Sequence, residues 1–82
     1  MKLVNKKKVF ELVKKGALLV DMRSPVDFRD SKIEGSVNLP LKNFLNKLTA
    51  TKDKKQKFII FGKTVEDGDI KNACNYAFEL GF

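Results

Sequence analysis

The 82-residue sequence contains no histidine, no tryptophan and a single cysteine, Cys74. Without histidine, the chain lacks the side chain that most often serves as a general base near neutral pH and as a metal ligand. A single cysteine cannot form a disulfide within the chain, and this usage is typical of a reducing compartment, so we expect a cytoplasmic location. The sequence therefore predicts no metal site and no cofactor.

Long apolar segments are also absent. No stretch approaches the ~20 apolar residues that a membrane-spanning helix needs. The first ten residues, MKLVNKKKVF, lack the apolar region of a secretory signal peptide. We therefore expect no membrane association. The length fits one domain, and a hydrophobic content of 43% is sufficient for a small core.

Positive charge is abundant and uneven. The net charge is +7, and six lysines lie within residues 1–16 and four within residues 52–57. Such runs could attract nucleic acid or anionic lipid. Phe10 is the one aromatic residue within these ranges, and they contain no arginine that would recognise bases or phosphates in a defined geometry. The composition favours a solvated lysine-rich surface, and nucleic-acid or anionic-surface binding is kept as an alternative.

The spacing of apolar residues predicts alternating helices and strands. Short apolar runs predict strands at residues 17–21, 37–39 and 58–61, the first and the last of them buried. Helical spacing predicts helices over residues 6–15, 41–48 and 70–78, the last with Phe78 on its apolar face. A further short helix is expected to begin with Ser24 as its cap and Pro25 in its first position, with Phe28 pointing inward. Alternating strands and helices predict an α/β fold with a mainly parallel sheet.

Residues 17–40, ALLVDMRSPVDFRDSKIEGSVNLP, resemble the first half of a rhodanese domain. The shared features are an apolar strand that ends in Asp21-Met22-Arg23, a Ser-Pro helix start, Gly35, and a second strand closed by Pro40. The resemblance implies a small three-layer α/β/α domain. It also implies structural roles for Asp21 and Arg23, through hydrogen bonds to neighbouring backbone, and for Gly35, through an unusual backbone angle.

The resemblance covers most of the chain, residues 1–82, which we interpret as a single domain. In the family, a glycine-aromatic pair like Gly81-Phe82 leads into one more strand. The domain is therefore expected to be truncated or minimal at its C-terminal end. A substitute strand could come from Leu3-Val4 or from a partner subunit.

The reactive loop of the family follows the strand that matches residues 58–61. There a cysteine accepts sulfur as a persulfide, and loop N–H groups with a helix N-terminus stabilise anions. Aligned on the strand, Gly62 takes the cysteine position; counted back from Gly81-Phe82, Thr64 takes it. Neither alignment supplies a cysteine, so no catalytic residue is predicted. The other loop residues are Lys63, Val65, Glu66, Asp67 and Gly68.

The charge of this loop is opposite to what thiolate chemistry needs. Glu66, Asp67 and Asp69 would raise the pKa of a nearby thiol and repel anionic substrates. A structural explanation is sufficient for these acids, with Asp69 expected to be the N-cap of the last helix. Cys74 lies on the apolar face of that helix, where we expect it to pack as a small hydrophobic residue.

These observations lead to three hypotheses about function. The first is a rhodanese-homology domain without sulfurtransferase activity that acts as a binding, regulatory or degenerate module. The second is an active sulfurtransferase, or a related phosphatase, that would need Cys74 or another group as acceptor. The third is the lysine-rich binder described above. A protein partner and a homodimer both stay open.

Overall fold

The computed structural model describes residues 3–63 and 67–82. In this part of the chain a three-stranded sheet is combined with four helices. Their bounds in chain order are α1 (Lys6–Lys14), β1 (Leu18–Asp21), α2 (Pro25–Asp30), β2 (Val37–Asn38), α3 (Leu41–Ala50), β3 (Phe58–Phe61) and α4 (Gly68–Glu79). The predicted alternation of helices and strands is confirmed.

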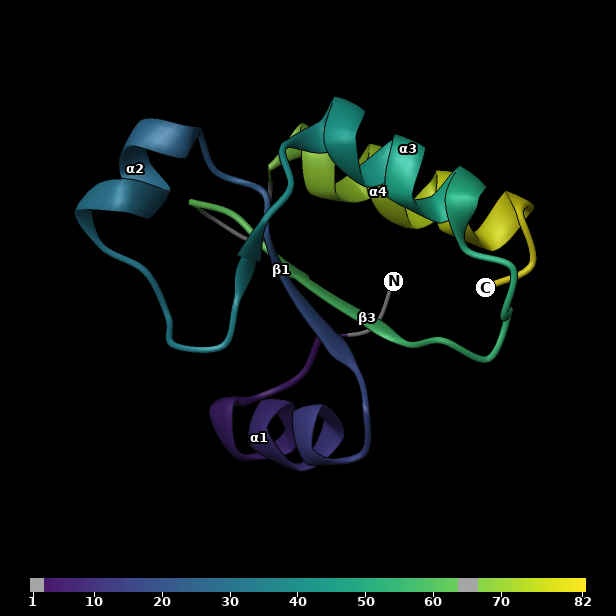
Figure 1. Ribbon diagram of the computed structural model, residues 1–82, viewed down its shortest axis with the longest axis horizontal. Coiled ribbons are helices and arrows are strands. Elements are labelled where there is room, and N and C mark those ends of the chain that lie inside the picture. The colour runs from purple at the N-terminus through teal and green to yellow at the C-terminus, as the bar shows by residue number, and fades with distance from the viewer. Residues whose placement is uncertain (1–2, 64–66) are drawn as a thin grey trace.

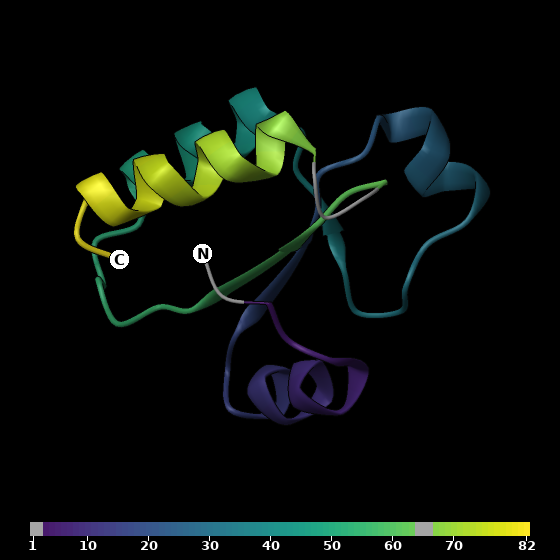
Figure 2. The ribbon, with the colours of Figure 1, turned by 180° about the vertical axis from the view of Figure 1, so that it is seen from behind.

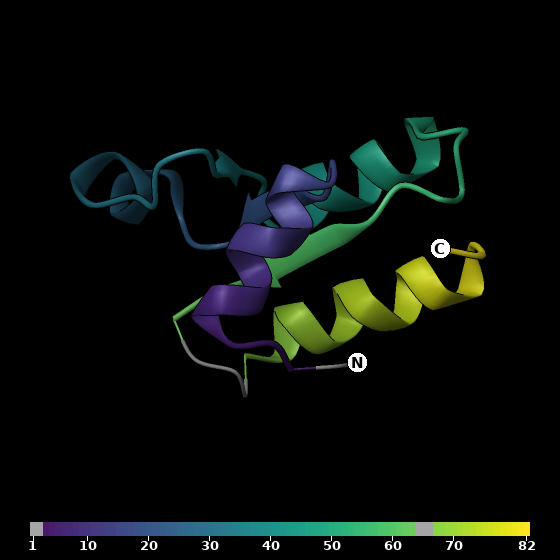
Figure 3. The same ribbon diagram turned by 90° about the horizontal axis from the view of Figure 1, so that it is seen from below.

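The sheet is parallel throughout and has the order β2-β1-β3. Helices α3 and α4 lie side by side on one face of the sheet (Figures 1 and 2). Helix α1 covers the opposite face, and the view from below places it in front of the sheet (Figure 3). Helix α2 lies beyond the carboxyl ends of the strands. These layers confirm the predicted α/β architecture.

The register of the strands brings their carboxyl ends to one edge. Asp21 at the end of β1 pairs with Asn38 of β2 on one side and with Phe61 of β3 on the other. In parallel sheets this edge is where ligand and catalytic sites usually form. The loops that follow the three strands therefore meet here, and the reactive-loop position of the family lies among them.

The core lies between the sheet and the pair α3 and α4. Its side chains are contributed by β1, α3 and α4, and Phe44 packs edge-to-face on Phe58 with ring centroids 5.4 Å apart. Each fully buried aliphatic or aromatic side chain contributes roughly 1.5–3 kcal/mol relative to an exposed one. The buried cluster consists of Val20, Met22, Phe44, Leu48, Ile70 and Ala73.

Two predictions about apolar residues are wrong. Strand β3 was predicted to be buried, but Phe58–Phe61 are all half-buried, because β3 has a ladder partner on only one side among the described residues. Phe78 was predicted on the apolar face of α4, yet it is 81% exposed. The inward face follows Ile70, Ala73 and Ala77, and position 78 lies about 100° around the helix from position 77.

Two further expectations also fail. Phe28 is half-buried rather than an inward anchor, since α2 lies beyond the end of the sheet. The centroid of the Phe28 ring lies 5.2 Å from the Lys32 ammonium. Leu3 and Val4 supply no substitute strand, and Leu3 is 68% exposed. To act as a strand, Leu3 and Val4 would need a neighbouring strand that pairs with their backbone N–H and C=O groups. None of the described residues provides such a strand beside them.

We expect Gly35→Ala to lower the free energy of unfolding by about 1–2 kcal/mol because Gly35 has a φ of +86°, which disfavours any Cβ. No atom lies within 4 Å of the added Cβ, so the cost is purely conformational. The matched control is Gly68→Ala in the first turn of α4, where the Cβ also meets nothing and φ is not positive. Urea unfolding of both variants checks this; equal stabilities would contradict it.

Candidate functional site

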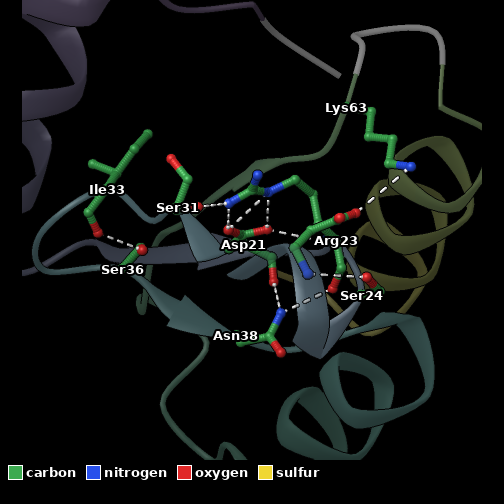
Figure 4. A network of polar contacts seen from close by, with 9 residues as sticks. Asp21, Arg23, Ser24, Ser31, Ile33, Ser36, Asn38 and Lys63 are labelled. Atoms are coloured by element: carbon green, nitrogen blue, oxygen red, sulfur yellow. Dashed lines mark hydrogen bonds and ion pairs between the residues drawn. The ribbon is translucent and has the colours of Figure 1, made fainter. Parts of the chain in front are cut away.

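The carboxyl edge of the sheet is organised around a buried ion pair. Asp21 is fully buried, and its Oδ2 accepts a hydrogen bond from Arg23 Nη2 at 2.8 Å. Its Oδ1 accepts from the Arg23 backbone N–H at 2.9 Å and from Arg23 Nε at 3.1 Å (Figure 4). These hydrogen bonds to Asp21 raise the pKa of the Arg23 guanidinium. The pair is therefore a fixed, internally satisfied unit.

The same unit ties together the segments around it. Arg23 Nη2 also donates to the carbonyl oxygen of Ser31, just after α2. Asn38 Nδ2 donates to the carbonyl oxygens of Asp21 at 3.0 Å and of Arg23 at 2.9 Å. Figure 4 shows these side chains converging from β1, β2 and the end of α2. The donors of Arg23 that make these bonds point into the fold, so they are not offered to a ligand.

The loop after β3 is tightly packed at its first position, Gly62. A Cβ on Gly62 would lie 3.0 Å from Oδ2 of Asp67 and 3.1 Å from Cδ1 of Ile70. Its φ lies outside the left-handed region, so space and not backbone conformation explains the glycine. In the alignment on the strand, Gly62 is the position of the family's reactive cysteine. A side chain at that position would therefore be in tight contact with the carboxylate of Asp67.

Asp67, and not Asp69, is the N-cap of α4, which corrects the sequence prediction. Asp67 Oδ1 accepts a hydrogen bond from the backbone N–H of Asp69 at 2.9 Å, and its carbonyl accepts from Ile70 N at 3.1 Å. Asp69 lies inside the first turn, where its negative charge is favourable near the helix N-terminus. The cap satisfies one of the N–H groups that could otherwise bind an anion.

Lys63 and Gly68 complete the described part of the loop. Lys63 is exposed and forms an ion pair with Asp27 of α2, with Nζ and Oδ2 3.6 Å apart. Gly68 is the first residue of α4. The second candidate position, Thr64, lies outside the described residues together with Val65 and Glu66.

Cys74 is half-buried and packs against the core cluster. Burial raises the pKa of its thiol, so little of it is thiolate at neutral pH. It lies seven residues after Asp67, which places it about 10 Å along the α4 axis from the helix start. The structure therefore does not bring the thiol to the described residues of the loop, 62–63 and 67–68.

Residues 3–63 and 67–82 contain no group of three or more His, Cys, Asp or Glu side chains placed to hold a metal ion. In the same part of the chain, no helix is both long and apolar enough to cross a membrane. Sequence reasoning missed the contact between Gly62 and Asp67. No local sequence pattern brings residue 62 next to residue 67, so the sequence carried no signal for this contact.

Comparison with known proteins agrees with this geometry. Residues 5–82 match the family model described as "Rhodanese-like domain". Among curated proteins, none matches the chain. Similar solved structures include the crystal structure of a Rhodanese_3 like domain from Anabaena sp., with 20% identity and a TM-score of 0.65, covering 80% of this chain and 74% of that one.

A solution structure of a rhodanese-like domain from Anabaena sp. has 20% identity and a TM-score of 0.69; it covers 93% of this chain, which spans 56% of that one. At 20% sequence identity, these two structures support the fold of this chain and nothing further. The match of the family model is independent of them and extends over nearly the whole chain. The match of the family model over residues 5–82 therefore shows that the chain belongs to the rhodanese-like domain family.

Proposed function

We propose that this rhodanese-like domain has no sulfurtransferase activity and acts as a binding or regulatory module. The observation that carries the proposal is the carboxylate of Asp67 beside Gly62, which in the alignment on the strand is where the family's persulfide chemistry needs a thiol. The Asp67 carboxylate would also raise the pKa of any thiol placed at residue 62 and would repel an anionic sulfur donor. The scaffold is kept while the reacting group is missing.

Cys74 does not replace the missing thiol in this proposal. Its pKa is raised by burial, and it lies on the core side of α4 at a distance from the loop. A sulfur acceptor needs an accessible thiolate, and an electropositive setting normally supplies it. Because burial disfavours the thiolate of Cys74, a binding role that uses the folded surface is the better explanation of the retained scaffold.

The test is a thiosulfate:cyanide sulfurtransferase assay on the intact chain. We expect no turnover above the rate without protein. Intact mass after incubation with thiosulfate is expected to stay unchanged, since a persulfide would add one sulfur atom, about 32 Da, to a thiolate. The control is Cys74→Ser: turnover or an added sulfur that disappears in this variant would establish the enzyme hypothesis and overturn the proposal.

A further inference from the structure

The two lysine runs of the sequence meet at the amino ends of β1 and β3. Leu18 and Phe58 are paired in register, so the segments that lead into the two strands lie side by side. Leu18 N donates to the carbonyl of Lys57 at 2.9 Å, and Gln56 Nε2 donates to the carbonyl of Gly16 at 3.0 Å. Figure 1 shows both strands starting on the side of the sheet that faces away from α2.

Two adjoining cavities open at this edge, with volumes of about 210 and 250 Å³. They adjoin because Gly16, Ala17 and Gln56 line both. The lysines that line one or the other are all exposed and come from both runs and from α3. They are Lys15, Lys47, Lys55 and Lys57, which we call the amino-edge lysine cluster.

The charge of this cluster is only partly balanced. Among the described residues, the ion pairs are Lys8–Glu11, Arg23–Asp21 and Lys63–Asp27, and none involves the cluster. Asp53 lines the second cavity, and its Oδ1 accepts from the backbone N–H of Lys55 at 2.9 Å. The C-terminal ends of α1 and α3 add about half a negative charge each. Four lysines outweigh these terms, so the edge remains positive.

We propose that the amino-edge lysine cluster binds the phosphodiester backbone of a nucleic acid strand, without selection among bases. Lysine ammonium groups are point charges that suit phosphate oxygens and do not impose the fork geometry that reads base edges. No arginine lines either cavity. The one aromatic ring there, Phe58, is packed between Phe44 and Phe82, with ring centroids 5.4 and 5.5 Å away, so it is not free to stack on a base.

The surroundings favour a nucleic acid strand over a lipid surface or a small anion. Binding to a membrane surface normally adds apolar insertion to charge attraction, and none of the large apolar side chains exposed in the described residues lines either cavity. A site for one small anion would need buried donors, whereas all four lysines are exposed. This inference does not depend on whether the domain is a sulfurtransferase.

The test is fluorescence anisotropy of a labelled single-stranded oligonucleotide with the intact chain at several salt concentrations. With four phosphate contacts, we expect the affinity to fall about 50-fold between 50 and 200 mM salt. The variant Lys15→Gln/Lys55→Gln/Lys57→Gln leaves one contact, so the same change of salt should cost only about 3-fold. Its affinity at the lower salt should be roughly tenfold weaker or more.

The matched control is Lys7→Gln/Lys42→Gln/Lys71→Gln, which removes the same charge from helix starts at the opposite edge. It should keep most of the affinity and of the salt dependence. A third variant with arginine at positions 15, 55 and 57 should bind like the original chain. Equal losses in the two glutamine variants, or no oligonucleotide binding at 50 mM salt, would overturn the proposal. The proposal would also be overturned if the chain did not bind the oligonucleotide but sedimented with phosphatidylserine vesicles, and if the first variant no longer sedimented with them.

Discussion

Replacing Asp21 with alanine is expected to lower the free energy of unfolding by about 2–3 kcal/mol. Asp21 is fully buried and accepts the hydrogen bonds of Arg23 from both side chain and backbone. Without it, the guanidinium keeps only the carbonyl of Ser31 as a partner, and a cavity is left at the end of β1. A domain of this size has roughly 4–12 kcal/mol in total, so the urea midpoint should fall sharply.

Asp27 is the matched control for this effect. It is also an aspartate paired with a cation, but its side chain is 35% exposed and that of its partner Lys63 is 75% exposed. Exposed pairs contribute at most about 1 kcal/mol, so Asp27→Ala should shift the urea midpoint only slightly. If the two alanine variants were equally stable, the Asp21–Arg23 unit would not organise the carboxyl edge as we describe.

Installing a cysteine at Gly62 is expected to fail as a restoration of the family's chemistry. The new Cβ would lie 3.0 Å from the carboxylate of Asp67 and 3.1 Å from Ile70, so neighbours must shift, at a cost of about 1–3 kcal/mol. The carboxylate would raise the pKa of the new thiol. In a Cys74→Ser background, Gly62→Cys should therefore be unfolded at lower urea, be alkylated slowly by iodoacetamide at neutral pH, and show no thiosulfate turnover.

The double variant Gly62→Cys/Asp67→Ser tests whether the Asp67 carboxylate causes both the loss of stability and the raised pKa of the new thiol. Serine is smaller and uncharged, and it still caps a helix well. We expect it to recover much of the lost stability and to move the pH dependence of alkylation to lower pH, because the repelling charge is gone. If Gly62→Cys alone were as stable as the original chain and rapidly alkylated, the position would have room and a favourable field for a thiolate, contrary to our description of the loop.

Much of the fold could be predicted from the sequence because local patterns determine it. Apolar runs marked the three strands, and Ser24 with Pro25 marked the start of α2, where the Ser24 hydroxyl accepts from Asp27 N. The errors concern residues whose burial depends on contacts with other helices and strands. Phe78 fits a loose helical pattern but lies outside the face that α4 turns to the core. Strand β3 is as apolar as a central strand, and only the sheet order shows it at an edge.

The candidate site was predictable only in part. The absence of cysteine from the loop could be read directly from the sequence. That Asp67 caps α4 and lies against Gly62 could not, because the pattern also allowed Asp69 as the cap and no local signal brings residue 62 next to residue 67. The meeting of residues 15–17 with residues 55–57 also depends on the register of β1 and β3, which no local signal specifies.

Strands β1 and β3 are only four residues long, which has an electrostatic consequence. Four residues of strand extend about 13 Å, so the two edges of the sheet lie not far beyond one Debye length of about 8 Å at physiological salt. Low-dielectric core, not water, fills much of that gap, and it screens charge weakly. A polyanion at the amino edge would therefore make the potential at Gly62 more negative, and this effect should weaken as the salt concentration rises.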